Sequence, residues 1–172
     1  MGTCRRPGTP RGTPSRRAIV KVAVIYESRT GNTRRAAELI GAAVAELGHE
    51  VGVWSTGEVN LDFLADADLV FVGTWTDGII VAGHRPGDKR RLEAMPGIWG
   101  KPTAGFVTYA VHCGKVLDKL ARVVRARGGE WIGGRAFRRD KLPEGIGEFV
   151  VAALEAVGGP EAVGLEAATS SD

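Results

Sequence analysis

The sequence predicts an α/β fold in which a parallel sheet is covered by helices on both faces. Five short apolar segments alternate with segments of helical periodicity, and glycine or proline separates several of them. This alternation favours parallel strands, because each crossover helix returns the chain to the same end of the sheet. The first apolar segment also runs directly into a turn rich in hydroxyl groups and glycine, which a helix follows.

The elements follow one another at regular intervals along the chain. The first strand lies around Val22 to Ile25, and the first helix opens at Asn32 and Thr33 and ends at Gly48. We then expect a strand at 50–54, a short helix at 61–65, a buried strand at 68–73, a helix at 87–95, a strand at 103–109, a helix at 115–127, a strand at 130–137 and a last helix from Ile146 to Val157.

Length and composition fit one domain between two polar ends. With 172 residues, of which 44% are hydrophobic, the chain can bury one sizeable core. Residues 1–17 contain five arginines and no acidic residue, which predicts a disordered basic arm. Residues 159–172 are predicted to form a flexible tail. The domain is therefore expected to span residues 18–158.

The same composition argues against several classes of function. Residues 18–158 are nearly neutral, so binding to nucleic acid is not expected. No apolar run approaches the roughly 20 residues that span a bilayer, so no membrane association is expected. The two cysteines, Cys4 and Cys113, lack the spacing of metal ligands, which indicates no metal site and a reducing, cytoplasmic setting.

The turn after the first strand has the composition of a phosphate-binding loop. The first N–H groups of a helix have no partner within the helix and carry the positive end of its dipole, so they bind anions. Hydroxyl side chains add donors, and glycine lets the backbone approach the ligand. The residues assigned to this loop are Ser28, Arg29, Thr30, Gly31, Asn32 and Thr33. The alternative is that these polar side chains only cap the helix.

Two further loops are expected at the same end of the sheet, after the third and fourth strands. Each carries an aromatic residue, Trp75 or Tyr109, and the two rings can stack on both faces of a flat tricyclic ligand. Packing at the strand ends is the alternative for each ring. The candidate binding residues are Thr74, Trp75, Thr76, Asp77 and Gly78 in the first of these loops, and Thr108, Tyr109, Ala110, His112, Cys113 and Gly114 in the second.

The pattern Ser28-x-Thr30-Gly31-Asn32-Thr33 resembles the FMN phosphate loop of the flavodoxin family. The resemblance covers roughly residues 18–158 and implies a flavodoxin-like three-layer sandwich, with a five-stranded parallel sheet in the order 2-1-3-4-5. It also implies that the two aromatic loops hold the flavin ring. The chain departs from the family in its near-neutral charge and in carrying His112 and Cys113 where acidic residues are usual. A charged His112 near the flavin is expected to favour the anionic reduced form, and the alternative is a solvated histidine that points away from the flavin.

The resemblance implies an FMN-binding, one-electron carrier that works between a flavin-containing reductase and a redox acceptor protein. Two alternatives remain open: an FMN-dependent NAD(P)H:quinone or related small-molecule oxidoreductase, with Arg85 in a nicotinamide site, and a protein-interaction module without FMN. No catalytic residue is assigned, and the oligomeric state is left open. A basic cluster is expected to form a solvated helix face, or alternatively a docking patch for an acidic partner; it comprises His84, Arg85, Lys89, Arg90 and Arg91.

Overall fold

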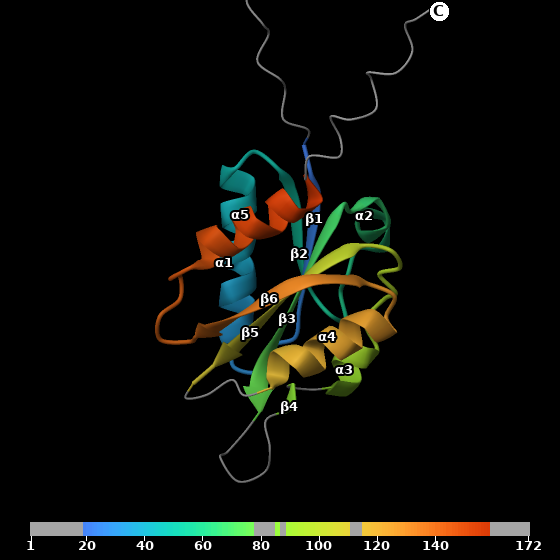
Figure 1. The fold of residues 1–172 in the computed structure, drawn as a ribbon. Coiled ribbons are helices and arrows are strands. Elements are labelled where there is room, and N and C mark those ends of the chain that lie inside the picture. The colour runs from blue at the N-terminus through green and yellow to red at the C-terminus, as the bar shows by residue number, and fades with distance from the viewer. Residues whose placement is uncertain (1–18, 78–84, 87–88, 111–114, 159–172) are drawn as a thin grey trace, which may run out of the picture.

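The centre of the fold is a parallel sheet whose strands run side by side in Figure 1. The computed structural model describes residues 19–77, 85–86, 89–110 and 115–158. The five long strands are β1 (Lys21–Tyr26), β2 (Glu50–Ser55), β3 (Leu69–Asp77), β5 (Pro102–Tyr109) and β6 (Glu130–Arg138). They are arranged in the order β2-β1-β3-β5-β6, and every neighbouring pair is parallel. Counted along the chain, this is the predicted order 2-1-3-4-5.

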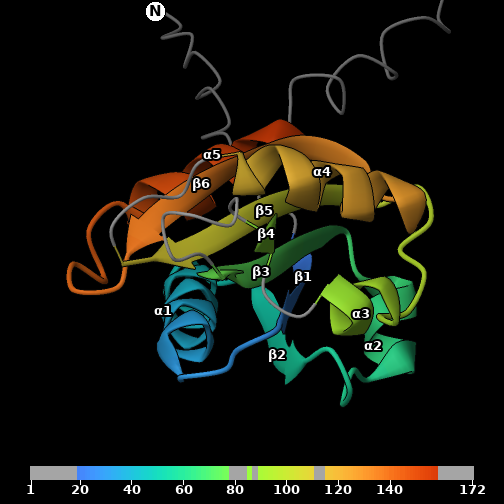
Figure 2. The same ribbon diagram turned by 90° about the horizontal axis from the view of Figure 1, so that it is seen from below.

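Helices cover both faces of the sheet, which gives the predicted three layers (Figure 2). One face is covered by α1 (Asn32–Glu46) and α5 (Ile146–Val157), which pack against each other as well as against the strands. The other face is covered by α2 (Leu61–Asp66), α3 (Lys89–Glu93) and α4 (Val116–Ala126). Among the described residues, no helix has the length and apolar character needed to cross a membrane.

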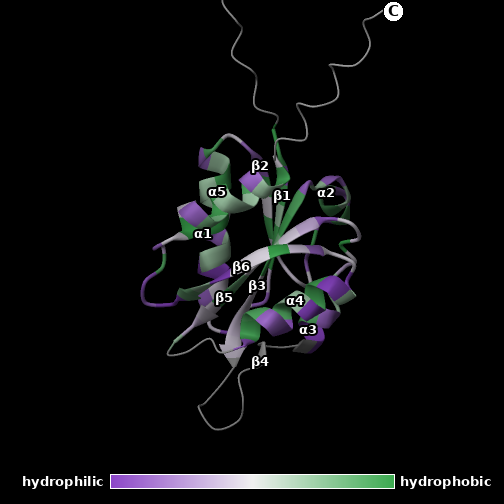
Figure 3. Ribbon diagram, in the orientation of Figure 1, coloured by the Kyte–Doolittle hydropathy of each residue, from purple (hydrophilic) through white to green (hydrophobic). Residues whose placement is uncertain are grey.

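The hydrophobic core consists of two layers, one on each face of the sheet. Along β1, Val22 and Val24 face the α1 and α5 side, whereas Ala23 and Ile25 face the α2, α3 and α4 side. All four are fully buried, which explains why a central parallel strand has a continuous apolar sequence instead of an alternating one. In Figure 3, β1 is hydrophobic and α4 carries both hydrophobic and hydrophilic residues.

The third long strand continues further than the sequence predicts. We expected a strand at 68–73 followed by a loop, but β3 runs to Asp77. The ladder between β3 and β5 continues to the pair Trp75 and Thr108, and a short strand, β4 (Arg85–Pro86), then pairs antiparallel with Thr76 and Asp77. Residues 74–77, which were expected in a loop, are therefore held by strand pairing. Thr74 and Trp75 pair with β5, and Thr76 and Asp77 pair with β4.

Other expected boundaries agree within a few residues, except that the helix predicted at 87–95 is described only as α3, Lys89–Glu93. The predicted arm at residues 1–17 and tail at residues 159–172 lie outside the described residues, so those two assignments remain predictions. The described part of the chain places the carboxyl ends of β1, β3 and β5 beside the start of α1, and this end of the sheet holds the candidate site.

Candidate functional site

A pocket of about 290 Å³ lies at the carboxyl ends of β3 and β5, beside the loop that opens α1. Ligands of open α/β sheets bind in this position, because the loops that follow parallel strands converge there. Four separate segments of the chain line the pocket. The lining residues are Arg29, Thr30, Asn32, Trp75, Thr76, Thr108, Tyr109, Ala110 and Arg139. All of them except Arg139 are candidates predicted from the sequence.

The loop that opens α1 is shaped by Gly31. This residue has a φ angle of +86°, in the left-handed region that glycine adopts without steric cost, and it occupies the N-cap position of α1. The Gly31 N–H donates to Ser28 Oγ at 3.1 Å, and Asn32 Nδ2 donates to Thr30 Oγ1 at 3.1 Å. The N-cap residue Gly31 has no side chain, and within the described residues no side-chain cap is found at the first N–H groups of α1. Ser28 accepts from the Gly31 N–H just before the helix, so capping by the loop stays the alternative to phosphate binding.

Beside this loop, two buried threonines join α1 to β5. The Thr33 and Thr108 hydroxyl oxygens lie 2.8 Å apart, and their residues are 1% and 3% exposed. The Thr76 hydroxyl donates to the Thr108 carbonyl at 3.4 Å, which links β3 to the same point. The loop that opens α1 and the ends of two strands are thus connected through hydroxyl groups.

Trp75 and Tyr109 both line the pocket, as the sequence predicts for a pair of stacking residues. They come from neighbouring strands, since Trp75 on β3 is paired in register with Thr108 on β5. The indole Nε1 of Trp75 is buried and has no hydrogen-bond partner. Buried N–H donors are almost always paired in native proteins, so this unpaired donor on a residue that lines the pocket is unusual.

Two arginines contribute positive charge to the pocket. The Arg29 guanidinium lies 5.8 Å from the centroid of the Trp75 ring, within cation–π distance. Arg139 follows β6, and its backbone N–H donates to the Tyr109 carbonyl at 3.0 Å. Sequence reasoning missed Arg139, because the pairing of β5 with β6 brings residues 109 and 139 together and no local motif marks that pairing.

The residue before the phosphate loop, Glu27, is a second group that sequence reasoning missed. It is 6% exposed at the end of β1 and accepts a 2.6 Å hydrogen bond from the Thr56 hydroxyl. Arg91 on α3 lies 3.4 Å from the other carboxylate oxygen. Burying a carboxylate is costly unless it is paired. Glu27 therefore ties α3 and the turn after β2 to the end of the strand that leads into the site.

The remaining candidates lie beside the pocket or outside the described residues. Ser28 and Gly31 shape the loop, Thr33 and Thr74 are buried, and Asp77 pairs with Arg85 in the β3–β4 ladder. Arg90 and Arg91 of the predicted basic cluster are exposed. Five of the named residues lie outside the part of the chain that the structure describes: Gly78, His84, His112, Cys113 and Gly114. Within the described part of the chain, no group of acidic, histidine or cysteine side chains is arranged to hold a metal.

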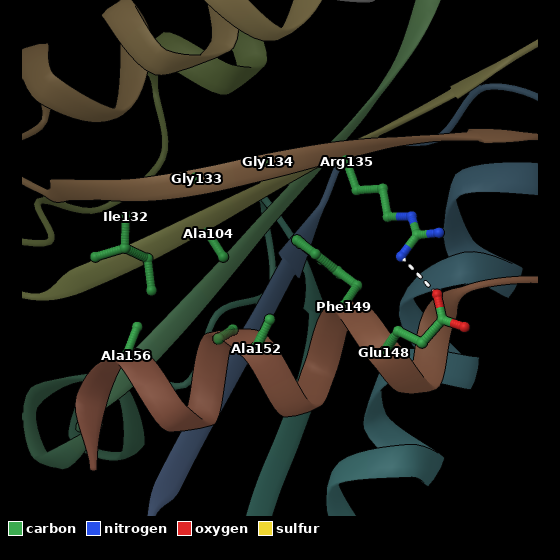
Figure 4. Close-up of a pocket in the computed structure, with 10 residues that line it drawn as sticks. Ala104, Ile132, Gly133, Gly134, Arg135, Glu148, Phe149, Ala152 and Ala156 are labelled. Atoms are coloured by element: carbon green, nitrogen blue, oxygen red, sulfur yellow. Dashed lines mark hydrogen bonds and ion pairs between the residues drawn. The ribbon is translucent and has the colours of Figure 1, made fainter. Parts of the chain in front are cut away.

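A second hollow of about 290 Å³ lies between β6 and α5 (Figure 4). Its described lining is mostly glycine and alanine, and its polar side chains, Arg135 and Glu148, bind each other at 3.1 Å. None of the predicted site residues lines it. The pocket at the ends of β3 and β5 is therefore the better candidate, because it combines aromatic rings with hydroxyl donors.

Comparison with known proteins agrees with this geometry. The family model of the flavodoxin domain matches residues 23–134. The chain belongs to the flavodoxin family. A flavodoxin from Clostridium beijerinckii is 33% identical over 92 residues, which are 54% of this chain and 67% of that protein. Membership of the family supports an FMN-binding electron carrier at the level of the family.

Two solved structures show the same fold. The two-electron reduced flavodoxin of Megasphaera elsdenii has a TM-score of 0.62 and 24% identity, over 78% of this flavodoxin-family chain and 98% of that one. Rubredoxin oxygen:oxidoreductase from Desulfovibrio gigas also has a TM-score of 0.62, at 15% identity, over 79% of this chain but 35% of that chain. The fold therefore also occurs as part of a longer polypeptide.

Proposed function

We propose that this flavodoxin-family protein binds FMN and carries electrons one at a time from a flavin-containing reductase to a redox acceptor protein. The observation that carries the proposal is that Trp75 and Tyr109 line the same pocket as Thr30 and Asn32 of the loop that opens α1. A flat aromatic ligand with a phosphate at one end fits these two groups of residues. When bound, FMN supplies the redox chemistry, and the protein supplies binding, orientation and charge.

The loop that opens α1 fits the phosphate. Its helix N–H groups lack a side-chain cap, and Gly31 in the left-handed region leaves open space where another residue would carry a Cβ atom. Thr30 accepts a hydrogen bond from Asn32, so its hydroxyl proton is available to a phosphate oxygen. In this proposal, Ser28 and Thr33 support the loop, since both side chains already have partners.

The two aromatic residues fit the flavin ring. Trp75 and Tyr109 both line the pocket and offer large rigid surfaces for stacking at small entropic cost. Asp77 at the end of β3, residue 78 after it and residues 110–114 after β5 are assigned to the ring as well. For His112 and Cys113 this assignment is a prediction, because both lie outside the described residues.

The described pockets support a carrier over a reductase. The pocket at the ends of β3 and β5 offers one pair of aromatic side chains, which suits a single flat ring system. The hollow between β6 and α5 lacks free polar side chains among its described lining residues. In this proposal, the electrons come from a separate protein. The exposed Arg90 and Arg91 support docking to a partner with an acidic face.

Purification and reconstitution test the proposal. The protein should become yellow when mixed with FMN, and denaturation should release FMN and not FAD. The loaded protein should stay oxidised for minutes with NADPH alone, and it should reduce an acceptor only after a flavin-containing reductase is added. Rapid bleaching by NADPH followed by quinone reduction would favour the oxidoreductase alternative. Absence of FMN binding would favour the interaction module.

A further inference from the structure

The described lining of the pocket contains two cationic side chains, Arg29 and Arg139, and no acidic one. We infer that these two arginines stabilise the negatively charged, reduced state of the flavin relative to its oxidised state, and thereby raise its midpoint potential. The inference rests on the proposed binding of FMN. It concerns the charge of the site and not the residues that hold the phosphate.

Arg29 belongs to the phosphate loop by sequence, but its charge lies at the aromatic part of the pocket. Its guanidinium is 5.8 Å from the centroid of the Trp75 ring. By contrast, Arg34 in the first turn of α1 binds Glu38 at 2.8 Å, so its charge is neutralised on the helix surface. No carboxylate among the described residues binds Arg29. Its positive charge is therefore available to a ligand that contacts Trp75.

Arg139 lines the pocket next to Tyr109, the second aromatic residue of the site. Its backbone N–H is bonded to the Tyr109 carbonyl at 3.0 Å, which fixes its main chain at the end of β5. The neighbouring acidic residue, Asp140, is already bound by Arg138 through two hydrogen bonds of 3.0 and 2.8 Å. This pair holds the pKa of Asp140 below its ordinary value and the pKa of Arg138 above it, chiefly through the side-chain hydrogen bonds. Among the described residues, Arg139 has no carboxylate partner.

Two positive charges at the pocket that is proposed to hold the ring act differently on the two redox states. Reduction places negative charge on the ring system, and a nearby cation stabilises the more negative state. Both arginines are exposed, so water and salt weaken this effect without removing it. Any contribution of the arginines to phosphate binding is the same in both redox states and cancels in the potential, because the potential depends on the ratio of the two affinities.

The test uses the full chain loaded with FMN and compares Arg29→Gln, Arg139→Gln and the double variant with the parent protein. Arg122→Gln is the matched control, because the substitution removes the same charge from a residue that is exposed on α4 and does not line the pocket. The measured quantity is the two-electron midpoint potential from a spectroscopic redox titration. We expect the double variant to lose about tenfold in affinity for the reduced form relative to the oxidised form, which lowers the potential by about 30 mV.

Two further measurements separate charge from structure. Arg29→Lys and Arg139→Lys keep the charge. Their potentials should therefore stay within about 10 mV of the parent, a third of the loss expected for the double glutamine variant. In 1 M salt, where the screening length is about 3 Å, the difference between the parent and the double variant should shrink. Equal losses with lysine and glutamine, or a difference insensitive to salt, would overturn the inference.

The failure of this inference is distinguishable from the failure of the proposed function. If the parent protein binds FMN and the double variant has the same potential as Arg122→Gln, the two arginines do not set the charge of the site, and the proposed function stands. If the parent protein binds no FMN, the proposed function fails and the inference fails with it. Thermal unfolding monitored by circular dichroism identifies any variant whose loss comes from misfolding.

Discussion

The hydroxyl oxygens of Thr33 and Thr108 lie 2.8 Å apart in the interior, although the residues are 75 positions apart in the chain. Thr33 belongs to the first turn of α1, and Thr108 belongs to the end of β5. Both residues are almost fully buried, so each hydroxyl depends on the other for a partner. This contact holds the loop that opens α1 against the strand that carries Tyr109.

The first prediction concerns this threonine pair. Thr33→Val or Thr108→Val leaves one buried hydroxyl without its partner, and each should lower the free energy of unfolding by about 1 to 3 kcal/mol. The double valine variant removes both polar groups, so it should lose less than the sum of the two single losses. Urea denaturation measures all three. Strictly additive losses would show that the two hydroxyls do not depend on each other.

The second prediction concerns Thr30 and the phosphate. Thr30→Val removes a hydroxyl that already accepts from Asn32 and has its proton free. A hydrogen bond to a charged group contributes about 1.5 to 3 kcal/mol, so FMN should bind about 10- to 100-fold more weakly. Riboflavin, which has no phosphate, should bind almost as it does to the parent protein. Equal weakening of both ligands in titration calorimetry would exclude Thr30 as a phosphate ligand.

The third prediction concerns the ring. Trp75→Ala and Tyr109→Ala should each weaken FMN by about 1 to 3 kcal/mol through lost stacking area. Trp75→Phe keeps an aromatic ring but loses the N–H and part of the stacking area, so its affinity should fall between that of the alanine variant and that of the parent. Trp54→Phe is the control, because Trp54 packs on Phe63 at 4.9 Å between ring centroids and does not line the pocket. Quenching of flavin fluorescence measures these affinities, and unchanged binding in both alanine variants would remove the stacking role.

The fourth prediction concerns Gly31. Nothing lies within 4 Å of the position that a Cβ atom would take, so the cost of Gly31→Ala comes from its φ angle of +86° alone. A left-handed conformation costs a residue with a side chain about 1 to 2 kcal/mol, and the variant should be destabilised by that amount. Gly57→Ala is the matched control, because it has the same open space and no left-handed φ angle. Chemical denaturation of the two variants should therefore differ by the conformational cost.

The fifth prediction concerns Arg138 and Asp140. The hydrogen bonds from Arg138 lower the pKa of Asp140 in the folded protein. The stability from this pair is present above the unfolded pKa of the carboxyl group and is lost as the pH falls through its folded pKa. Arg138→Gln should return the pKa of Asp140 toward its ordinary value and remove this acid-side contribution. Carboxyl NMR shifts followed from pH 6 to pH 2 check it, and an unchanged titration of Asp140 in the variant would contradict the assignment.

The strands and helices could be predicted because each element carries a local signal, and their order in the sheet came from the resemblance to the flavodoxin family. The apolar run at Val22 to Ile25 and the helical stripe from Ile146 to Val157 depend on residues that are neighbours in sequence, and both elements formed where expected. The extension of β3 to Asp77 could not be predicted in this way. Threonine is common in strands and also occurs in turns, so Thr74 and Thr76 do not mark the end of the strand by type, and pairing with β5 and β4 extends it.

The residues of the candidate site also differ in whether a local sequence signal marks them. Thr30, Asn32, Trp75 and Tyr109 stand at positions that a motif or a strand end marks, so they could be named from the sequence. Arg139 enters the pocket through the register between β5 and β6, which no pattern in either segment encodes. The partners of Glu27 depend on the approach of α3 and the turn after β2 to the end of β1. Contacts between distant segments are visible only in the tertiary structure, because no local sequence pattern specifies them.

Because the pocket takes residues from the segments 29–32, 75–76, 108–110 and 139, a molecule that fills it recognises only the assembled sheet. The ligand and the folding equilibrium are then linked by mass action. A ligand present at 100 times its dissociation constant adds about 2.7 kcal/mol to the free energy of unfolding. In the proposed function, the supply of FMN would thus influence how long the protein survives proteolysis.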